Sequence, residues 1–260
     1  MDLGLDGTVA LVTGARGNIG VATCAALRRE GMTVIASDFG VDEAQDIGDG
    51  YEWRSLDVTS AADWARVIAG IEADHGRLDV LVNNAGVAPT DRIDRMPPEQ
   101  FRRAFDVNVT GVFLGTQAAA ALLARSGALR EGGAALINIA SGAADKPAAF
   151  NAAYCATKAA VRMFTRATAV EFSTLGFPIR VNSVHPGAVE SDMMDSILAR
   201  YGELTGASRD ELAAGIARLH PMGRLVKPDE VADAIVWLAS RAARYTHAAA
   251  VHVDGGNANT

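Results

Sequence analysis

Two side chains that could move a proton stand four positions apart in an alanine-rich run with a helical pattern. They are Tyr154 and Lys158, within residues 151–164. Positions i and i+4 of a helix share a face, so the phenol and the ammonium point the same way. A phenol with a pKa near ~10 is a poor base at neutral pH, and a nearby ammonium favours the phenolate. The pair predicts a tyrosine that exchanges a proton with an alcohol, although a half-buried aromatic beside a solvated lysine has the same pattern.

A glycine-rich turn near the N-terminus has the composition of a phosphate cradle. Gly14, Gly17 and Gly20 directly follow the apolar run 8–13 and lead into a helical pattern. Glycines let the backbone approach a pyrophosphate, and the start of a helix supplies free N–H groups and a favourable dipole. The turn therefore predicts a dinucleotide site that also includes Arg16, Asn18 and Ile19. A plain strand-to-helix turn is the simpler alternative.

Asp38 indicates which dinucleotide to expect. It ends the second strand-like run, at about the 20-residue distance expected for a carboxylate that binds a ribose 2′-hydroxyl. A carboxylate there repels a 2′-phosphate, so Asp38 favours NAD over NADP. Arg16 is the opposing signal, because a basic residue in this turn could bind that phosphate. We expect the repulsion between Asp38 and a 2′-phosphate to outweigh the attraction of Arg16, so we predict NAD. The simpler alternative is that Asp38 is only a turn residue.

The elements that must position these residues alternate along the whole chain as short apolar runs and longer helical patterns. Such alternation predicts a parallel sheet covered by helices on both faces, and nearly all-apolar strands fit burial on both faces. We predict one α/β domain over residues 1–260, a Rossmann-type doubly wound parallel sheet of about seven strands. The expected strands are 8–13, 33–37, 51–58, 79–86, 134–141, 179–187 and 249–256, and the expected helices lie near 19–30, 61–75, 99–125, 152–175 and 229–241.

The longest section without a clear pattern is 187–228, which contains Met193, Met194 and Met222. Long irregular segments in compact domains are usually functional or mobile. We therefore predict an irregular substrate lid at about 188–226.

Composition excludes several classes of protein. The 260 residues are 49% hydrophobic and 21% charged, with a net charge of −7, which argues against disorder and gives no electrostatic reason to bind nucleic acid. Cys24 and Cys155 form no disulfide framework, and this suits a reducing, cytoplasmic location. No uncharged apolar run reaches the ~20 residues of a membrane span, and the acidic start predicts no signal peptide. His75 and His185 lie in no ligand spacing, so we predict no metal site.

Further motifs occur in a fixed order along nearly the full length. They are TGARGNIG, Asp57 in LDVTS, NNAG at 83–86, Asn108 in VNVTG, Ser141 in NIAS, YCATK at 154–158, HPG at 185–187 and VDGG near the end. With these motifs the chain resembles a short-chain dehydrogenase/reductase of the single-domain type. A lone Tyr-x-x-x-Lys is weak support, whereas this ordered set is specific. The resemblance implies NAD-linked interconversion of a secondary alcohol and a ketone.

The resemblance also implies a role for each residue of the site. Tyr154 would be the general acid/base, Lys158 would favour its ionisation and hold the nicotinamide ribose, and Ser141 would donate a hydrogen bond to the substrate oxygen. Asn108 would interrupt a helix and hold a water that links Lys158 to solvent. Besides Tyr154 and Lys158, the implied cofactor contacts are Asp57, Val58, Asn84, Ala85, Gly86, Pro186, Gly187, Val189 and Ser191.

Two departures from the family pattern stand out. The family's usual turn, T-G-x-x-x-G-x-G, has its second glycine where this chain has Asn18, and the glycine lies at Gly17 instead. Asn tolerates positive φ better than most residues, so we expect the turn to be preserved. The family's near-terminal Thr-Gly is replaced by Thr246-His247, which puts the local geometry there in question.

The residues expected around the substrate are small or apolar, and methionines adapt to irregular apolar shapes. We therefore predict a bulky, weakly polar substrate, such as a cyclic alcohol, an aryl alcohol or a hydroxysteroid. The pocket residues are Ala143, Phe150, Ala188, Met193 and Met194.

Three alternatives remain open at this point. A 3-oxoacyl-carrier-protein reductase would favour NADP and a basic patch, for which Arg102, Arg103, Arg125 and Arg130 are available. The glycine spacing is typical of longer epimerases, but we expect their substrate domain to need roughly 60–100 further residues. A non-enzymatic NAD-binding sensor is the third, and it would not need the four site residues together.

The assembly predicted for the chain also rests on the resemblance, because the family usually forms homotetramers. The alanine-rich faces at 115–124 and 156–170 are the expected contacts between subunits. The same faces could instead only cover the sheet.

Overall fold

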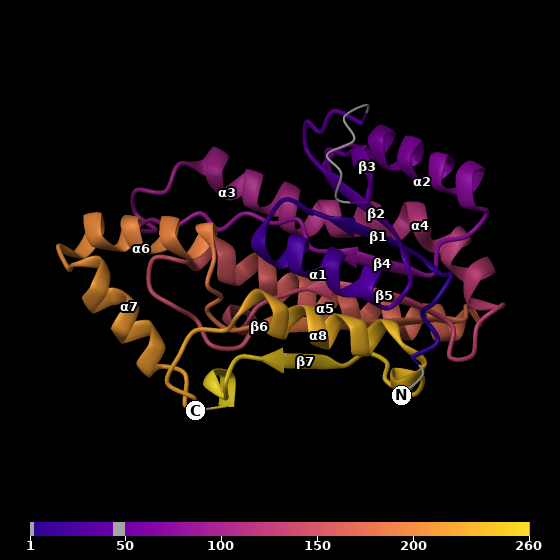
Figure 1. The fold of residues 1–260 in the computed structure, drawn as a ribbon. Coiled ribbons are helices and arrows are strands. Elements are labelled where there is room, and N and C mark those ends of the chain that lie inside the picture. Colours follow the sequence, from indigo (N-terminus) through magenta and orange to yellow (C-terminus); the bar gives the residue numbers. More distant parts are fainter. Residues whose placement is uncertain (1–2, 44–49, 260) are drawn as a thin grey trace.

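Seven parallel strands form the sheet at the centre of the molecule (Figure 1). The computed structural model describes residues 3–43 and 50–259. The strand order is β3-β2-β1-β4-β5-β6-β7, which is the Rossmann-type arrangement predicted from the sequence. The strands are β1 (Val9–Thr13), β2 (Thr33–Asp38), β3 (Glu52–Ser55), β4 (Val80–Asn83), β5 (Ala134–Ile139), β6 (Ile179–Pro186) and β7 (Ala250–Val253).

Helices cover both faces of this sheet and make two apolar layers. On one face α1 and α8 pack side by side, and Cys24, Leu27 and Ile235 join the strands in one core cluster. On the other face α2, α4 and α5 bury a second cluster that includes Trp64 and Phe172. The helices are α1 (Asn18–Arg29), α2 (Ala61–His75), α3 (Pro98–Phe105), α4 (Gly111–Gly127), α5 (Ala152–Thr174), α6 (Asp192–Thr205), α7 (Arg209–Arg218) and α8 (Pro228–Ala239).

The double cover explains the apolar runs in the sequence. Every residue of the inner strands β1, β4, β5 and β6 is buried. The edge strands β3 and β7 are only half-buried. Because both faces of an inner strand meet helices, period-two alternation of polar side chains would place polar groups in a core.

Residues 187–228 are largely helical, so the prediction of an irregular section there is wrong. The section holds α6 and α7 at one end of the molecule, on the left in Figure 1. Leu198 is the residue of α6 that is fully buried, and α7 has no fully buried residue within its described length. Few side chains of these helices are therefore in the core, although Met194, Ile197 and Leu198 of α6 recur at helical spacing.

The predicted helix 99–125 is continuous in direction but changes type part-way. A π-helical segment, η1 (Asp106–Thr110), joins α3 to α4. Such segments are rare and occur mostly at functional sites. By length and composition alone the run Pro98–Gly127, which contains an 18-residue window with a mean hydropathy of 1.5, could cross a membrane. Apolar residues of this run are buried in the core, since Ala119, Leu122 and Leu123 pack in the same cluster as Trp64.

Candidate active site

A cavity of about 740 Å³ opens at the carboxyl ends of β1, β4, β5 and β6. It lies beside the point between β1 and β4 where the strand order changes direction, the place where doubly wound sheets bind ligands. Most residues predicted for the site line it: Gly14, Gly17, Asn18, Ile19, Asp38, Asp57, Val58, Asn84, Ala85, Gly86, Ser141, Ala143, Tyr154, Lys158, Pro186, Gly187, Ala188, Val189, Ser191, Met193 and Met194.

Four predicted residues are not among those that line the cavity. The side chain of Arg16 is exposed to solvent, and Gly20 packs beneath the glycine turn. Asn108 lies behind the cavity wall and is bonded to Val87. The ring of Phe150 packs edge-on against the ring of Tyr201, 5.7 Å between centroids. Phe150 has φ of 63°, a conformation rare for a bulky side chain.

The glycine turn has room for a ligand only because two positions lack a side chain. Gly14 has φ of +64°, and a Cβ there would lie 2.8 Å from the Ala85 Cα. A Cβ on Gly20 would lie 2.2 Å from the Gly14 carbonyl oxygen. These contacts show that the turn, the start of α1 and the end of β4 are packed backbone to backbone, as a dinucleotide cradle needs.

The asparagine that replaces the family's glycine does not need an unusual backbone. Asn18 begins α1, and among the described non-glycine residues positive φ occurs at Phe150 and Ala248. Gly17, at φ of −73°, precedes it in extended conformation. The Oδ1 atom of Asn18 accepts a hydrogen bond from the backbone N–H of Asp192 (3.2 Å). The side chain therefore connects the glycine turn to the first residue of α6.

Asp38 is held at one end of the cavity by backbone donors. Its Oδ2 accepts from the N–H of Arg16 (2.9 Å) and its Oδ1 from the N–H of Phe39 (2.8 Å). Asp38 and Phe39 line the cavity, whereas the side chain of Arg16 points into solvent. The group that faces a ligand at this end is thus the carboxylate and not the guanidinium.

Tyr154, Lys158 and Ser141 meet at the cavity floor. Tyr154 and Lys158 lie in the first turns of α5, and the Lys158 Nζ is 5.6 Å from the centre of the tyrosine ring. Nζ donates to the carbonyl oxygen of Ile139 at the end of β5 (2.8 Å). The side chain of Ser141 lies near enough to the Tyr154 hydroxyl to lower the pKa of that phenol. These three contacts bring together the groups needed to hold an alcohol oxygen and move its proton.

The electrostatics of the pair differ from the prediction. Burial raises the pKa of Tyr154, and the side chain of Ser141 only partly opposes this rise. Burial also lowers the pKa of Lys158 to about 8. Desolvation disfavours the charged form of both groups. The predicted lowering of the phenol pKa by the ammonium is therefore not found in the protein by itself.

Asn108 connects the π segment to the cavity wall. Its Oδ1 accepts from the N–H of Val87 (2.8 Å), and its amide group donates to the Val87 carbonyl (2.9 Å) and to Thr157 Oγ1 (3.0 Å). Both amide hydrogens are thus used within the protein. The bonds fix the loop after Gly86 against α5, and the water relay implied by the family stays a prediction.

The part of the cavity formed by the segment 146–151, by α6, and by α7 and the residues just after it is called the substrate half here. It contains residues that the sequence did not indicate. A helix assignment for 192–218 would have found three of them, Ile197, Tyr201 and Ile216. The full set is Lys146, Ala148, Asn151, Ile197, Tyr201, Ile216, Leu219 and His220.

His247, the second departure from the family, has a structural role. Its Nδ1 accepts from the N–H of Val181 in β6 (3.1 Å), and its Nε2 lies 2.9 Å from the carbonyl oxygen of Ala169 in α5. The imidazole therefore joins β6 to α5 far from the cavity.

The geometry agrees with what known proteins show. A family model described as "Enoyl-(Acyl carrier protein) reductase", of the short-chain dehydrogenase/reductase type, matches residues 14–258. The chain is a short-chain dehydrogenase/reductase. This confirms the family predicted from the motifs.

Curated relatives of this dehydrogenase/reductase act on different alcohols, according to their names. Cyclopentanol dehydrogenase of Comamonas sp. is 37% identical, over 95% of this chain and 96% of that protein. The 3-beta-hydroxysteroid dehydrogenase of Comamonas testosteroni is 34% identical, over 96% and 95%. Galactitol 2-dehydrogenase of Agrobacterium fabrum is 33% identical, over 97% and 98%. This chain is an oxidoreductase of that family.

Solved structures with the same fold include two reductases. A variant of actinorhodin polyketide ketoreductase with NADPH superposes with a TM-score of 0.87 at 32% identity, covering 98% of this chain and 99% of the other. The 3-ketoacyl-(acyl-carrier-protein) reductase of Brucella melitensis with NADH gives 0.84 at 31%, covering 98% and 99%. The family uses nicotinamide cofactors, and these two neighbours hold different ones.

Proposed function

We propose that this chain interconverts a secondary alcohol and a ketone with NAD, and that Tyr154 is the general acid/base. The observation that carries the proposal is the contact of Tyr154 with Ser141 on one side and Lys158 on the other, at the floor of the cavity. The backbone cradle at Gly14 and Gly20 fits a dinucleotide. When bound, NAD would accept the hydride and bring a positive nicotinamide ring to the site.

The chain's own residues would do the following. Ser141 would donate a hydrogen bond to the alcohol oxygen and orient it toward Tyr154. The hydroxyl proton of the alcohol would pass to the Tyr154 oxygen as the hydride leaves carbon. Lys158 would have to be charged to favour the phenolate, and its pKa of about 8 makes that charge sensitive to pH near neutrality. Positive charge brought to the site favours the phenolate further.

We propose NAD as the cofactor because of Asp38. Its carboxylate lies at the cavity edge with both oxygens fixed by backbone N–H groups. A 2′-phosphate placed there would meet a negative charge that cannot turn away. The side chain of Arg16 lies outside the cavity, so it does not offset that repulsion.

For the substrate we propose a cyclic or otherwise bulky alcohol of low polarity. Apolar side chains line the substrate half, among them Met193, Met194, Ile197, Ile216 and Leu219. Few of its polar atoms are available to recognise a string of hydroxyl groups, because neighbouring protein atoms already bond most of them.

Three polar residues of this half show how their atoms are occupied. Asn151 Nδ2 donates to the Tyr201 hydroxyl (3.0 Å), and that hydroxyl donates to the Ala149 carbonyl (2.7 Å). His220 accepts from the N–H of Ala188 (3.1 Å) and bonds the Ile216 carbonyl (2.9 Å). A polyol would have to break these bonds, whereas a cyclopentanol-like ring would not.

A carrier-protein ketoreductase is the second candidate, favoured by the two solved neighbours. Its basic patch is not assembled as the sequence predicted. Arg125 pairs with Glu72, and Arg130 is turned inward to the carbonyl oxygens of Asp79, Gly4 and Ala239. Only Arg102 and Arg103 of α3 remain, and Arg103 lines the cavity itself.

The test is a steady-state panel of cyclopentanol, a 3β-hydroxysteroid and galactitol, each with NAD⁺ and NADP⁺. We expect the highest kcat/KM with NAD⁺ and one of the first two alcohols. Tyr154→Phe should lower kcat at least about 1,000-fold and leave the Kd for NADH within twofold. Turnover that survives this substitution, or a strong preference for NADPH and a ketoacyl thioester, would replace the proposal by the second candidate.

We also propose a homotetramer. After the sheet is covered, α4 and α5 still present Phe113, Met163 and Val170 to solvent, each at least 44% exposed. These side chains fit contacts between subunits. Sedimentation equilibrium should give four times the 27.1 kDa chain mass. A cytoplasmic location remains a proposal drawn from the cysteines.

A further inference from the structure

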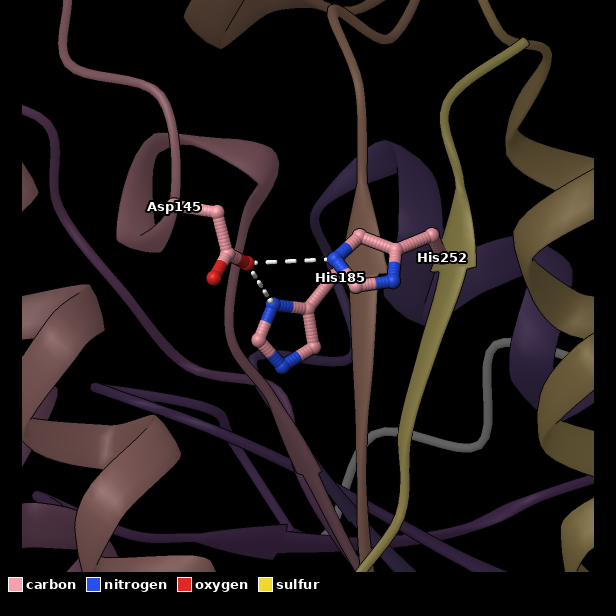
Figure 2. A group of neighbouring side chains, drawn as sticks. All are labelled: Asp145, His185 and His252. Carbon is pink, nitrogen blue, oxygen red and sulfur yellow. Dashed lines mark hydrogen bonds and ion pairs between the residues drawn. The ribbon is translucent and has the colours of Figure 1, made fainter. Parts of the chain in front are cut away.

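Three titratable side chains from distant parts of the sequence meet beside Ser141. His185 of β6 and His252 of β7 are register partners on adjacent strands. Figure 2 shows the Asp145 carboxylate facing both imidazoles. Asp145 Oδ2 is 3.3 Å from His185 Nδ1 and 3.1 Å from His252 Nε2. Since Asp145 ends the short turn η2 (Gly142–Ala144) that follows Ser141, the cluster contacts the segment that carries the serine.

The cluster is also tied to the helix that carries the tyrosine. Arg162 forms an ion pair with Asp145. Arg162 lies one helical turn beyond Lys158 and two beyond Tyr154 on α5, so the three share a face. Ser141 and Tyr154 therefore sit on two segments that Asp145 and Arg162 clamp together.

The partners of His185 determine which ring nitrogen carries the proton. Its Nδ1 faces two acceptors, the Ser141 carbonyl oxygen (3.2 Å) and Asp145 Oδ2, so Nδ1 must be the donor. Its Nε2 is 2.8 Å from the hydroxyl of Ser183. This hydroxyl can donate to Nε2 in place of its longer bond to the Ala249 carbonyl (3.4 Å). The ring is completely buried. Burial, followed by the nearby charges of His252 and Arg162, lowers the pKa of His185 to about 3, so the ring stays neutral.

The same three residues could be considered as a metal site, since one ligand atom from each lies within 4.8 Å of the others. The charge around them argues against it. The Arg162 guanidinium already holds the other oxygen of Asp145, and Lys158 adds positive charge toward His185. A divalent cation would enter a site whose single carboxylate is neutralised.

We propose that His185 is a positioning residue for Ser141. Its Nδ1–H holds the Ser141 carbonyl, while Asp145 and Arg162 hold the following turn against α5. The distance and direction between the Ser141 hydroxyl and the Tyr154 hydroxyl are thereby fixed. The inference rests on the proposed function, and it assigns a role to a histidine that touches neither the cavity nor a ligand.

The geometry is tested first without turnover. Long-range ¹H–¹⁵N spectra of protein labelled in histidine, with His185→Asn to assign the signal, should show a neutral ring protonated at Nδ1 from pH 8 to pH 5. A ring protonated at Nε2, or one that titrates in this range, overturns the proposal. So does stoichiometric Zn²⁺ binding that shifts the same signal at micromolar concentration.

The kinetic test compares two substitutions. His185→Leu removes the donor, whereas His185→Asn keeps an amide donor near the position of Nδ1. We expect kcat to fall about tenfold in His185→Leu, with the NADH Kd and the KM within twofold, and to recover at least half in His185→Asn. The acid limb of kcat against pH should move to higher pH in His185→Leu, because the Ser141 side chain is what opposes the burial of Tyr154.

A structural role alone would not move that profile. The groups that face Tyr154 are Ser141 from the η2 turn and Lys158 and Cys155 from α5, and Lys158 and Cys155 are unchanged in both variants. Equal kcat in the two variants at matched melting temperature would sink the proposal. An inactive wild type with the Nδ1–H signal intact would instead contradict the proposed function.

Discussion

The two ends of the sheet differ in the backbone groups that the helices leave without partners. At the carboxyl ends of the strands the helices begin, and their free N–H groups face the cavity, as at the glycine turn and at Ser191, which caps α6. At the amino ends the helices finish, and their last carbonyl oxygens need donors. The chain supplies donors there itself, with the buried Arg180 and the half-buried Arg130.

Arg180 shows how the amino end is sealed. It lies at the start of β6 and donates to the carbonyl oxygens of Leu238 (2.7 Å) and Ala239 (3.4 Å) at the end of α8, and to that of Gly132 (2.8 Å). Burial lowers its pKa to about 10, which still leaves it charged. One end is therefore filled with protein cations, and the other is left open for an anionic ligand. We therefore expect substitutions at the amino end to lower stability and substitutions at the carboxyl end to weaken ligand binding.

The largest expected effect is on stability, at the sealed end. Arg180→Met leaves several buried carbonyl oxygens without a donor, so the free energy of unfolding should fall by about 4 kcal/mol. Exposed Arg29→Met on α1 is the control and should change it by less than about 0.5 kcal/mol. Denaturant unfolding measures both. If Arg180→Met weakened NADH binding by more kcal/mol than it lowered the free energy of unfolding, the proposed separation between the two ends would be wrong.

At the open end the strongest effect should come from Gly20→Ala. The new Cβ would lie 2.2 Å from the Gly14 carbonyl oxygen, so the turn must move away from the cradle geometry. We expect NADH affinity to fall at least about 100-fold, or 2.8 kcal/mol, by fluorescence titration. Gly17→Ala is the matched control, because its Cβ would lie 3.5 Å from the same oxygen at a negative φ. Equal losses in the two variants would show that the crowding is not the cause.

The next effect concerns which dinucleotide the open end accepts. Asp38→Ser removes the carboxylate and should shift the ratio of NADP⁺ to NAD⁺ kcat/KM by about 30-fold toward NADP⁺, or about 2 kcal/mol. Arg16→Met should leave the ratio within threefold, because that side chain points into solvent. If Arg16→Met instead abolishes NADP⁺ use, the basic residue and not Asp38 sets the preference.

The smallest effect is expected in the substrate half. Met193 is 40% exposed, and Met193→Ala should raise the KM for a cyclic alcohol by about threefold with the NADH Kd unchanged. Leu129→Ala, at an exposed residue beyond the end of α4, should change neither constant. An effect of Met193→Ala on NADH binding would show that the two halves of the cavity are not independent.

The sequence predicted the sheet well and the substrate half poorly, for a physical reason. Inner strands such as β5 are apolar throughout because two layers bury them, and the pattern shows this directly. Helices α6 and α7 bury few residues, although Met194, Ile197 and Leu198 of α6 recur at helical spacing. The sequence nevertheless carries signals for their ends. Ser208 and Glu211 form a capping box at the start of α7, and Gly206 ends α6 at φ of 77°.

The catalytic geometry was predictable in its residues but not in its charges. The spacing of Tyr154 and Lys158 placed them on one face, as the structure places them. The predicted lowering of the Tyr154 pKa is not found in the protein by itself, because the depth of a helix face below a cavity floor cannot be deduced from spacing. The cluster of Asp145, His185 and His252 was missed because strand register, not sequence distance, brings its members together.

The hydrogen bond from the Asp192 N–H to the Asn18 side chain has a consequence for the order of events in turnover. It joins the glycine turn to the first residue of α6 across the mouth of the cavity. If α6 moves, this bond would transmit the movement to the glycine turn. We therefore predict that opening toward solvent and release of a dinucleotide from the proposed cradle are coupled. An enzyme limited by that step would show nearly the same kcat for chemically different alcohols, however much their individual KM values differ.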